Sequence, residues 1–179
     1  MKLGQPAWSK SLPPDAAVAM ATLGPIGTSM KAPGTWGSLA GIIFFLVACT
    51  PLSDLEILVA TAILGYFAIG VCGEAELRIG RKDPGEVILD EAVAIPLCFL
   101  GWRMIAGGSG FLAFMGLVIA AFALFRFYDI RKPWVIDRLQ ELPGGWGIVV
   151  DDTGAALATC ATLHLAHALW ALTAGHAPA

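Results

Sequence analysis

The sequence predicts an all-α fold: a polytopic membrane bundle of about five hydrophobic helices, preceded by an N-terminal lead-in helix. Of the 179 residues, 57% are hydrophobic and only 14% are charged, and the mean hydropathy is +0.74. Soluble domains carry about 25% charged residues, so this composition indicates an integral membrane protein. The hydrophobic residues also gather into runs separated by Pro, Gly and charged residues, which is typical of successive membrane helices.

We expect one domain over residues 1–179, because no linker or internal repeat divides the sequence. Residues 1–34 are rich in Pro and Gly and are expected to form a cytoplasmic lead-in. They do not have the pattern of a signal peptide, since Pro13, Pro14 and Asp15 interrupt the first apolar patch.

Charge and cysteine usage exclude two classes of function. The formal net charge is −3, and no basic stripe exists that could bind a nucleic acid. No two cysteines have the spacing of a zinc site. We therefore expect the four of them to be reduced and buried in apolar segments: Cys49, Cys72, Cys98 and Cys160.

Five hydrophobic segments follow the lead-in, joined by short polar connections. The first opens at Thr35-Trp-Gly-Ser38, where either hydroxyl could cap a helix, and the fourth ends before Pro133. Several are shorter than the ~20 residues that span a bilayer, so we expect some to be tilted or partly inserted. The expected segments cover 35–52, 57–72, 83–105, 111–127 and 153–174, with the last opened by Asp151 and Asp152.

The basic residues predict how these helices are oriented. With five spans and a cytoplasmic N-terminus, the loops over 73–85 and 126–150 share the cytoplasmic side with the lead-in. Ten of the eleven Lys and Arg residues then lie on that side, and Arg103 alone lies on the other. The same topology brings two distant acidic stretches, 83–91 and 129–152, to one membrane face.

Six carboxylates in these two stretches suggest a metal site. If Glu86 begins a helix, it shares one face with Asp90, about 40° away around the axis. Ionised carboxylates at the start of a hydrophobic helix cost free energy in a membrane, and the nearby basic residues are too few to neutralise them. Oxygen ligands without thiols or imidazoles suit Mg²⁺ or Mn²⁺ better than zinc. The six are Glu86, Asp90, Glu91, Asp129, Asp151 and Asp152.

Basic and glycine-rich residues beside these acids suggest that a phosphate binds there. Arg126 lies three residues before Asp129 on one helical face, and Arg131 and Lys132 follow. A glycine-rich stretch over 144–147 could bring backbone amides close to a phosphate. Taken singly, the Arg126–Asp129 pair could be only a local ion pair, and Asp151 could be only a helix cap.

Two other patterns in the sequence are weaker candidates for a functional site. Cys72 and Arg78 have the Cys-x5-Arg spacing of cysteine phosphatases, but the residues between them include two glutamates that would repel an anion. His164 and His167 could both ligate a metal, but they lie three turns from the acidic end of the last helix.

Four motifs in order closely resemble those of the phosphatidylglycerophosphatase A family. They are Pro33-Gly-Thr-Trp-Gly-Ser-Leu-Ala40, Lys82-Asp-Pro-Gly-Glu-Val-Ile-Leu-Asp-Glu91, Phe125-Arg-x-x-Asp-Ile-x-Lys-Pro-Trp134 and Gly144-Gly-x-Gly-Ile-x-x-Asp-Asp152. The resemblance covers roughly residues 24–160. It implies an all-helical Mg²⁺-dependent phosphatase of the bacterial inner membrane that converts phosphatidylglycerophosphate to phosphatidylglycerol in phospholipid biosynthesis.

On this basis we assign expected roles to the motif residues. Metal ligands are expected at Glu86, Asp90, Asp129, Asp151 and Asp152, with Glu91 as a further ligand or a nearby base. Phosphate contacts are expected from Thr35, Ser38, Arg126 and Lys132. The catalytic group is thus Asp90, Glu91, Asp129 and Asp152, facing the cytoplasm, with water or an aspartate as nucleophile. A membrane cation carrier or channel that uses the same acids as an ion path is the alternative function.

Overall fold

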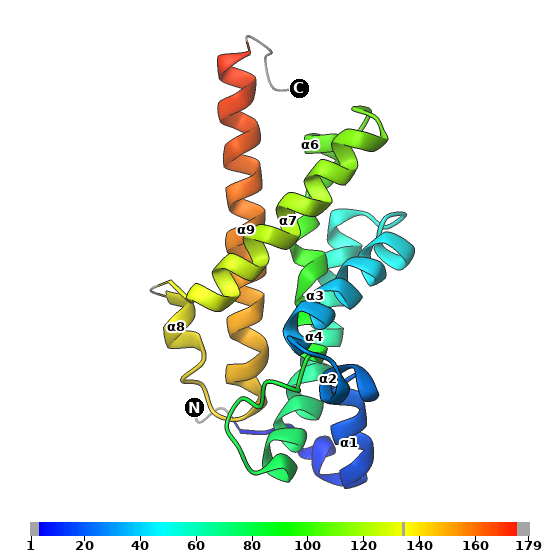
Figure 1. Cartoon of the computed structure of the whole chain (residues 1–179), viewed down its shortest axis with the longest axis vertical. Helices are drawn as coiled ribbons and strands as arrows, with labels where there is room; N and C mark the ends of the chain where they lie inside the picture. Colours follow the sequence, from blue (N-terminus) through cyan, green and yellow to red (C-terminus); the bar gives the residue numbers. More distant parts are fainter. Residues whose placement is uncertain (1–3, 134, 175–179) are drawn as a thin grey trace.

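The computed structural model describes residues 4–133 and 135–174, and all the regular structure in these ranges is helical (Figure 1). The elements in order are η1 (Ala7–Ser11), α1 (Pro14–Ala21), α2 (Pro25–Ser29), α3 (Pro33–Phe44), η2 (Phe45–Cys49), α4 (Asp54–Ile79), α5 (Leu89–Ala94), η3 (Ile95–Phe99), α6 (Trp102–Ala106), α7 (Phe111–Arg131), α8 (Val135–Leu139) and α9 (Gly145–Thr173).

The chain runs between two ends of an elongated bundle (Figure 1). The lead-in helices, the loop before α5 and helix α8 lie at the lower end, and α9 carries the chain to the upper end. Within the described residues, three helices are long and apolar enough to cross a membrane: α4, α7 and α9. The all-helical membrane fold is therefore confirmed. The first and third predicted segments are present as shorter apolar pieces, α3–η2 and α5–η3.

A capping motif sets the start of helix α4. Ser53 and Glu56 form a capping box, in which the Ser53 hydroxyl accepts from the Glu56 amide and the Glu56 carboxylate accepts from the Ser53 amide. The helix continues to Gly80, which ends it in a left-handed conformation. The expected polar loop over 73–85 is therefore wrong at its start, because residues 73–79 are helical.

The third segment is broken and starts later than expected. Its first helix begins at Leu89, so Glu86 lies in the preceding loop and does not share a helical face with Asp90. Pro96 stands in a short 3-10 helix that follows α5, since proline cannot continue an α-helical hydrogen-bond ladder. The aromatic ring of Phe99, at the end of this piece, stacks on Phe45 with centroids 3.9 Å apart.

Helix α9 starts eight residues earlier than predicted. Gly145 and Gly147 belong to its first turn and not to a phosphate-binding loop. A Cβ at Gly145 would lie 1.9 Å from the Ile69 carbonyl oxygen of α4, so the glycine allows two helices to approach closely. This correction moves Asp151 and Asp152 from a helix cap into the second turn of α9.

Candidate active site

A small polar cavity of about 130 Å³ lies near the lower end of the bundle. Four segments meet around it: the loop before α5, α5 itself, the C-terminal end of α7 and the second turn of α9. Six carboxylates and one lysine are among its lining residues: Asp83, Asp90, Glu91, Asp129, Lys132, Asp151 and Asp152. The two acidic stretches predicted to meet thus form one site.

Helix α5 contributes two adjacent carboxylates that are both almost completely buried. Asp90 is 5% exposed and Glu91 is 9% exposed. The Oδ1 atom of Asp90 is buried and has no hydrogen-bond partner within the described residues. Such an orphaned acceptor is rare in folded proteins, so this oxygen is a candidate ligand atom.

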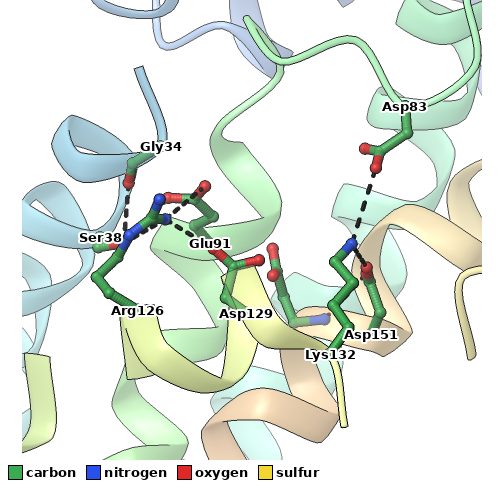
Figure 2. A network of polar contacts seen from close by, with 9 residues as sticks. Gly34, Ser38, Asp83, Glu91, Arg126, Asp129, Lys132 and Asp151 are labelled. Carbon is green, nitrogen blue, oxygen red and sulfur yellow. Dashed lines mark hydrogen bonds and ion pairs between the residues drawn. The ribbon is translucent and has the colours of Figure 1, made fainter. Parts of the chain in front are cut away.

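Arg126 holds one side of the site (Figure 2). Its Nη1 atom lies 2.8 Å from Asp129 Oδ2 and donates to Glu91 Oε1 at 3.1 Å. The Ser38 hydroxyl lies 3.0 Å from the other oxygen of Glu91 and 2.8 Å from the Gly34 carbonyl oxygen. The Glu91 carboxylate is therefore fixed by a guanidinium and a hydroxyl from two other helices.

Lys132 holds the other side (Figure 2). It ends α7 in a left-handed conformation, with φ +39°, which is uncommon for a residue other than glycine. Its ammonium group pairs with Asp151 and lies 3.9 Å from Asp83 Oδ2. Asp83 was not predicted at the site, although it lies within the second motif, next to the predicted acids.

The charges of the site do not balance. Six carboxylates line the cavity, whereas the basic groups in contact with them are Arg126 and Lys132. Burial raises the pKa of Glu91 to about 7, against the lowering effect of Arg126. Burial and the neighbouring Glu91 charge raise the pKa of Asp90 well above its usual range. Ionised acids at this site therefore need a further positive charge.

Helix α3 approaches α5 through a stripe of glycines. A Cβ at Gly34 would lie 2.3 Å from Glu91 Oε1, and one at Gly37 would lie 2.8 Å from Glu91 Oε2. One turn later, a Cβ at Gly41 would lie 2.7 Å from Ile95 Cβ. The spacing i, i+3 and i+7 places the three glycines on one face, and the same spacing can be read in the first motif of the sequence.

Four predicted residues are absent from the cavity lining: Thr35, Ser38, Glu86 and Arg126, of which Arg126 contacts the lining acids Glu91 and Asp129. The Glu86 carboxylate, expected to be a metal ligand, pairs with Arg81 and is partly exposed. Thr35, expected to bind phosphate, is half-buried in the first turn of α3 and does not line the cavity. Ser38 is buried and contacts Glu91 instead of facing open space. The roles proposed for these residues remain predictions.

The donor atoms at the cavity fit a hard divalent cation, although they are not assembled as a ligand cage. Among the described residues, no three Asp, Glu, His or Cys side chains already form a group that could hold a metal ion. Basic side chains form ion pairs with several of these acids instead. Arg126, for example, pairs with Glu91 and Asp129. The unpartnered Asp90 oxygen and the all-oxygen donor set are what Mg²⁺ requires.

The two weaker candidate patterns in the sequence have structural explanations. Cys72 and Arg78 lie on the continuous helix α4, where Cys72 is fully buried and Arg78 pairs with Glu74. They therefore do not form an anion-binding loop. His164 lies far along α9, with its Nε2 2.7 Å from the Leu100 carbonyl oxygen, so it joins α9 to the turn before α6.

Comparisons with known proteins identify the family. The family model described as phosphatidylglycerophosphatase A matches residues 19–167. A protein of that name from Haemophilus influenzae is 36% identical over 73% of this chain and 76% of its own length, and one from Escherichia coli is 28% identical over 82% and 80%. A putative phosphatidylinositol-3-phosphatase from Bacteroides thetaiotaomicron is 34% identical over 73% and 80%. No solved structure matches the chain. As the four motifs predicted, the chain belongs to the phosphatidylglycerophosphatase A family and is a phosphatase.

Proposed function

We propose that the chain is a Mg²⁺-dependent phosphatase that hydrolyses phosphatidylglycerophosphate to phosphatidylglycerol and phosphate, at the cytoplasmic face of the bacterial inner membrane. The observation that carries the proposal is the convergence of six carboxylates and Lys132 on one cavity, with Arg126 paired to two of the lining acids. The names of the relatives from H. influenzae and E. coli support the substrate.

Four aspartates would hold the metal: Asp90, Asp129, Asp151 and Asp152. Each lines the cavity, and Asp90 has the oxygen that is left without a partner among the described residues. When bound, Mg²⁺ would neutralise phosphate charge and lower the pKa of a water molecule. Glu86 is not included in this set, because it pairs with Arg81 outside the cavity.

Lys132, which lines the cavity, and Arg126, which is paired with the lining acids Glu91 and Asp129, would bind the phosphate oxygens. Both are about one-fifth exposed, so they can reach a ligand while the surrounding protein weakens screening by water. Their positive charges would stabilise the negative charge that grows as the phosphate ester is cleaved. In the absence of substrate, both are paired with acids, which keeps the side chains ordered.

Ser38 would position Glu91 rather than contact the phosphate. The Ser38 hydroxyl donates to Oε2 of Glu91, and the Arg126 guanidinium donates to Oε1. A carboxylate held in this way keeps one orientation toward the cavity, as a proton acceptor or a ligand must. The nucleophile would be water, with an aspartate as the alternative that the sequence leaves open.

The ion-path alternative is not favoured by the arrangement of the acids. A carrier would place acids on several helices near the middle of the membrane. Here Asp129 lies in the last turn of α7, and Asp151 and Asp152 lie near the start of α9. Basic side chains pair with these acids, which suits an anionic substrate better than a cation in transit.

Phosphate release from defined lipids tests the proposal. The purified full chain in detergent is supplied with phosphatidylglycerophosphate, phosphatidic acid or phosphatidylinositol 3-phosphate, with Mg²⁺ or with EDTA. We expect Mg²⁺-dependent release that is fastest from phosphatidylglycerophosphate. Faster release from phosphatidylinositol 3-phosphate would assign the activity named for the B. thetaiotaomicron relative, and release unaffected by EDTA would exclude the metal.

A further inference from the structure

A second, apolar groove of about 420 Å³ lies beside the acidic cavity. It is bounded by the end of α7, the short helix α8 and one face of α9, which lie next to one another at the lower end of the bundle (Figure 1). Its walls include Tyr128, Pro133, Val135, Ile136, Leu139 and Gly154. The hydroxyl of Tyr128 lies 2.8 Å from Thr162 Oγ1, so the polar atom of this wall is already satisfied.

The groove and the acidic cavity are formed by neighbouring residues. On α7, Tyr128 lines the groove and Asp129 lines the cavity. At the end of α7, Pro133 lines the groove and Lys132 lines the cavity. On α9, Gly154 follows Asp151 by three residues and so lies on the same side of the helix. The two spaces therefore share their walls on two different elements.

Another apolar groove, of about 350 Å³, has α9 but not α7 in common with the acidic cavity. It lies between α4 and α9, and its lining includes Gly65, Val149 and Thr153. Val149 and Thr153 are two residues before and after Asp151, so each points about 160° away from it around α9. This groove provides a comparison, because it is equally apolar but faces away from the Lys132–Asp151 pair.

We propose that the groove between α7, α8 and α9 holds an acyl chain of the lipid substrate while the phosphate occupies the cavity. The inference rests on the proposed function, since it assigns a place to the part of the substrate that does not react. Helices α7 and α9 are both long and apolar enough to cross the membrane, so two candidate membrane spans border the groove. An apolar chain suits these walls, and a soluble phosphate ester has no group to fill them.

Filling the groove tests this inference. A Cβ at Gly154 would lie 2.9 Å from Leu139 Cδ1 and 3.5 Å from Ile136 Cγ1, so Gly154→Leu places a side chain inside the groove. Substrates are dipalmitoyl phosphatidylglycerophosphate in micelles and its water-soluble dibutyryl analogue. We expect kcat/KM for the long-chain lipid to fall by about tenfold or more, since several methylenes lose their apolar contacts. Activity on the dibutyryl analogue should stay within about twofold of wild type.

Two further variants keep the test decisive. Gly65→Leu fills the comparison groove, where a Cβ meets only Val149 Cγ1 at 4.0 Å, and should not change the long-chain to short-chain ratio. Val135→Asp places a charge at the mouth of the proposed groove on a residue that is 67% exposed, so the core is undisturbed even if Gly154→Leu fails to fold. It should lower the ratio in the same direction as Gly154→Leu.

The outcomes separate the inference from the proposed function. An unchanged ratio in both Gly154→Leu and Val135→Asp, or a lowered ratio in Gly65→Leu alone, would overturn the assignment of the groove. If wild-type protein released phosphate from neither substrate, the proposed function itself would fail. A lowered ratio in both groove variants, with wild-type thermal stability in Val135→Asp, would support the acyl-chain site.

Discussion

Gly37→Ala tests whether the close approach of α3 to α5 positions the catalytic acids. The new Cβ would lie 2.8 Å from Glu91 Oε2, 2.8 Å from Ile88 Cβ and 2.9 Å from the Ile88 carbonyl oxygen. Two of these three atoms belong to the backbone or to the start of a side chain, so rotation of a flexible group does not relieve the contact. Helix α5 must move away from α3 by several tenths of an ångström, and Glu91 must move with it.

The structure gives the size of the effect. Overpacking a well-packed interior costs about 1–3 kcal/mol, and we expect the melting temperature to fall by about 2 to 12 °C for a chain of this length. A small displacement of Glu91 relative to Arg126 should lower kcat by about tenfold or more. Thermal unfolding in detergent and phosphate release from phosphatidylglycerophosphate measure the two effects on one preparation.

Gly116→Ala is the matched control. Gly116 lies on α7, and a Cβ there would meet no atom within 4 Å. Alanine inside a helix is favoured over glycine by about 0.5–1 kcal/mol, so this variant should melt at or above the wild-type temperature with unchanged activity. Wild-type stability and activity in Gly37→Ala would refute the view that α3 and α5 are held at this distance by glycine.

Four other substitutions have defined outcomes. Asp90→Asn and Asp152→Asn should each lower kcat by about a thousandfold, and the double variant should be little worse because the residues act as a unit; additive losses would separate their roles. Cys72→Ser should leave phosphate release nearly unchanged, whereas a loss beyond about a hundredfold in folded protein would favour a thiolate mechanism. A cysteine replacing the exposed Arg138 should resist an impermeant thiol reagent in intact cells, and ready labelling would reverse the proposed orientation.

The sequence predicted the class of the fold and most of the acids at the site. Composition alone separated this chain from soluble proteins, and the spacing of the basic residues predicted that the two acidic stretches share one end. That prediction depends on the chain crossing the membrane at each segment, which stays a prediction for the short α3–η2 and α5–η3 pieces. The cavity formed by Asp90, Glu91, Asp129, Asp151 and Asp152 confirms that these stretches meet.

The sequence predicts a start of α9 that is too late, because glycine is common both in loops and at close contacts between helices. Glycine is a common loop residue, so a stretch with Gly144, Gly145 and Gly147 was assigned to a loop. In the structure, tertiary packing overrides this propensity, since Gly145 lets α9 contact α4 at the Ile69 carbonyl. The distinction between a flexible loop and a close helix contact depends on which surface lies opposite, and one sequence does not contain that information.

The contacts of individual side chains could not be predicted from the sequence either. Glu86 has the same chemistry as Glu91, but the first pairs with Arg81 in a loop and the second is buried against Ser38 and Arg126. Helix spacing placed Glu86 beside Asp90 only on the assumption that the helix begins before Leu89. Asp83 shows the converse, because it reaches the cavity from a loop whose path no helical periodicity could predict.

Mg²⁺-dependent thermal stability tests most directly whether the converging acids hold a metal. A ligand at about 100 times its Kd stabilises the folded state by about 2.7 kcal/mol, which for wild-type protein predicts a rise in melting temperature of about 5–11 °C. Asp90→Asn should show little of this rise, and without Mg²⁺ it should melt at or above wild type because one charge leaves a crowded set. An equal rise in wild type and Asp90→Asn at matched ionic strength, or no rise in wild type, would contradict a metal site at this cavity.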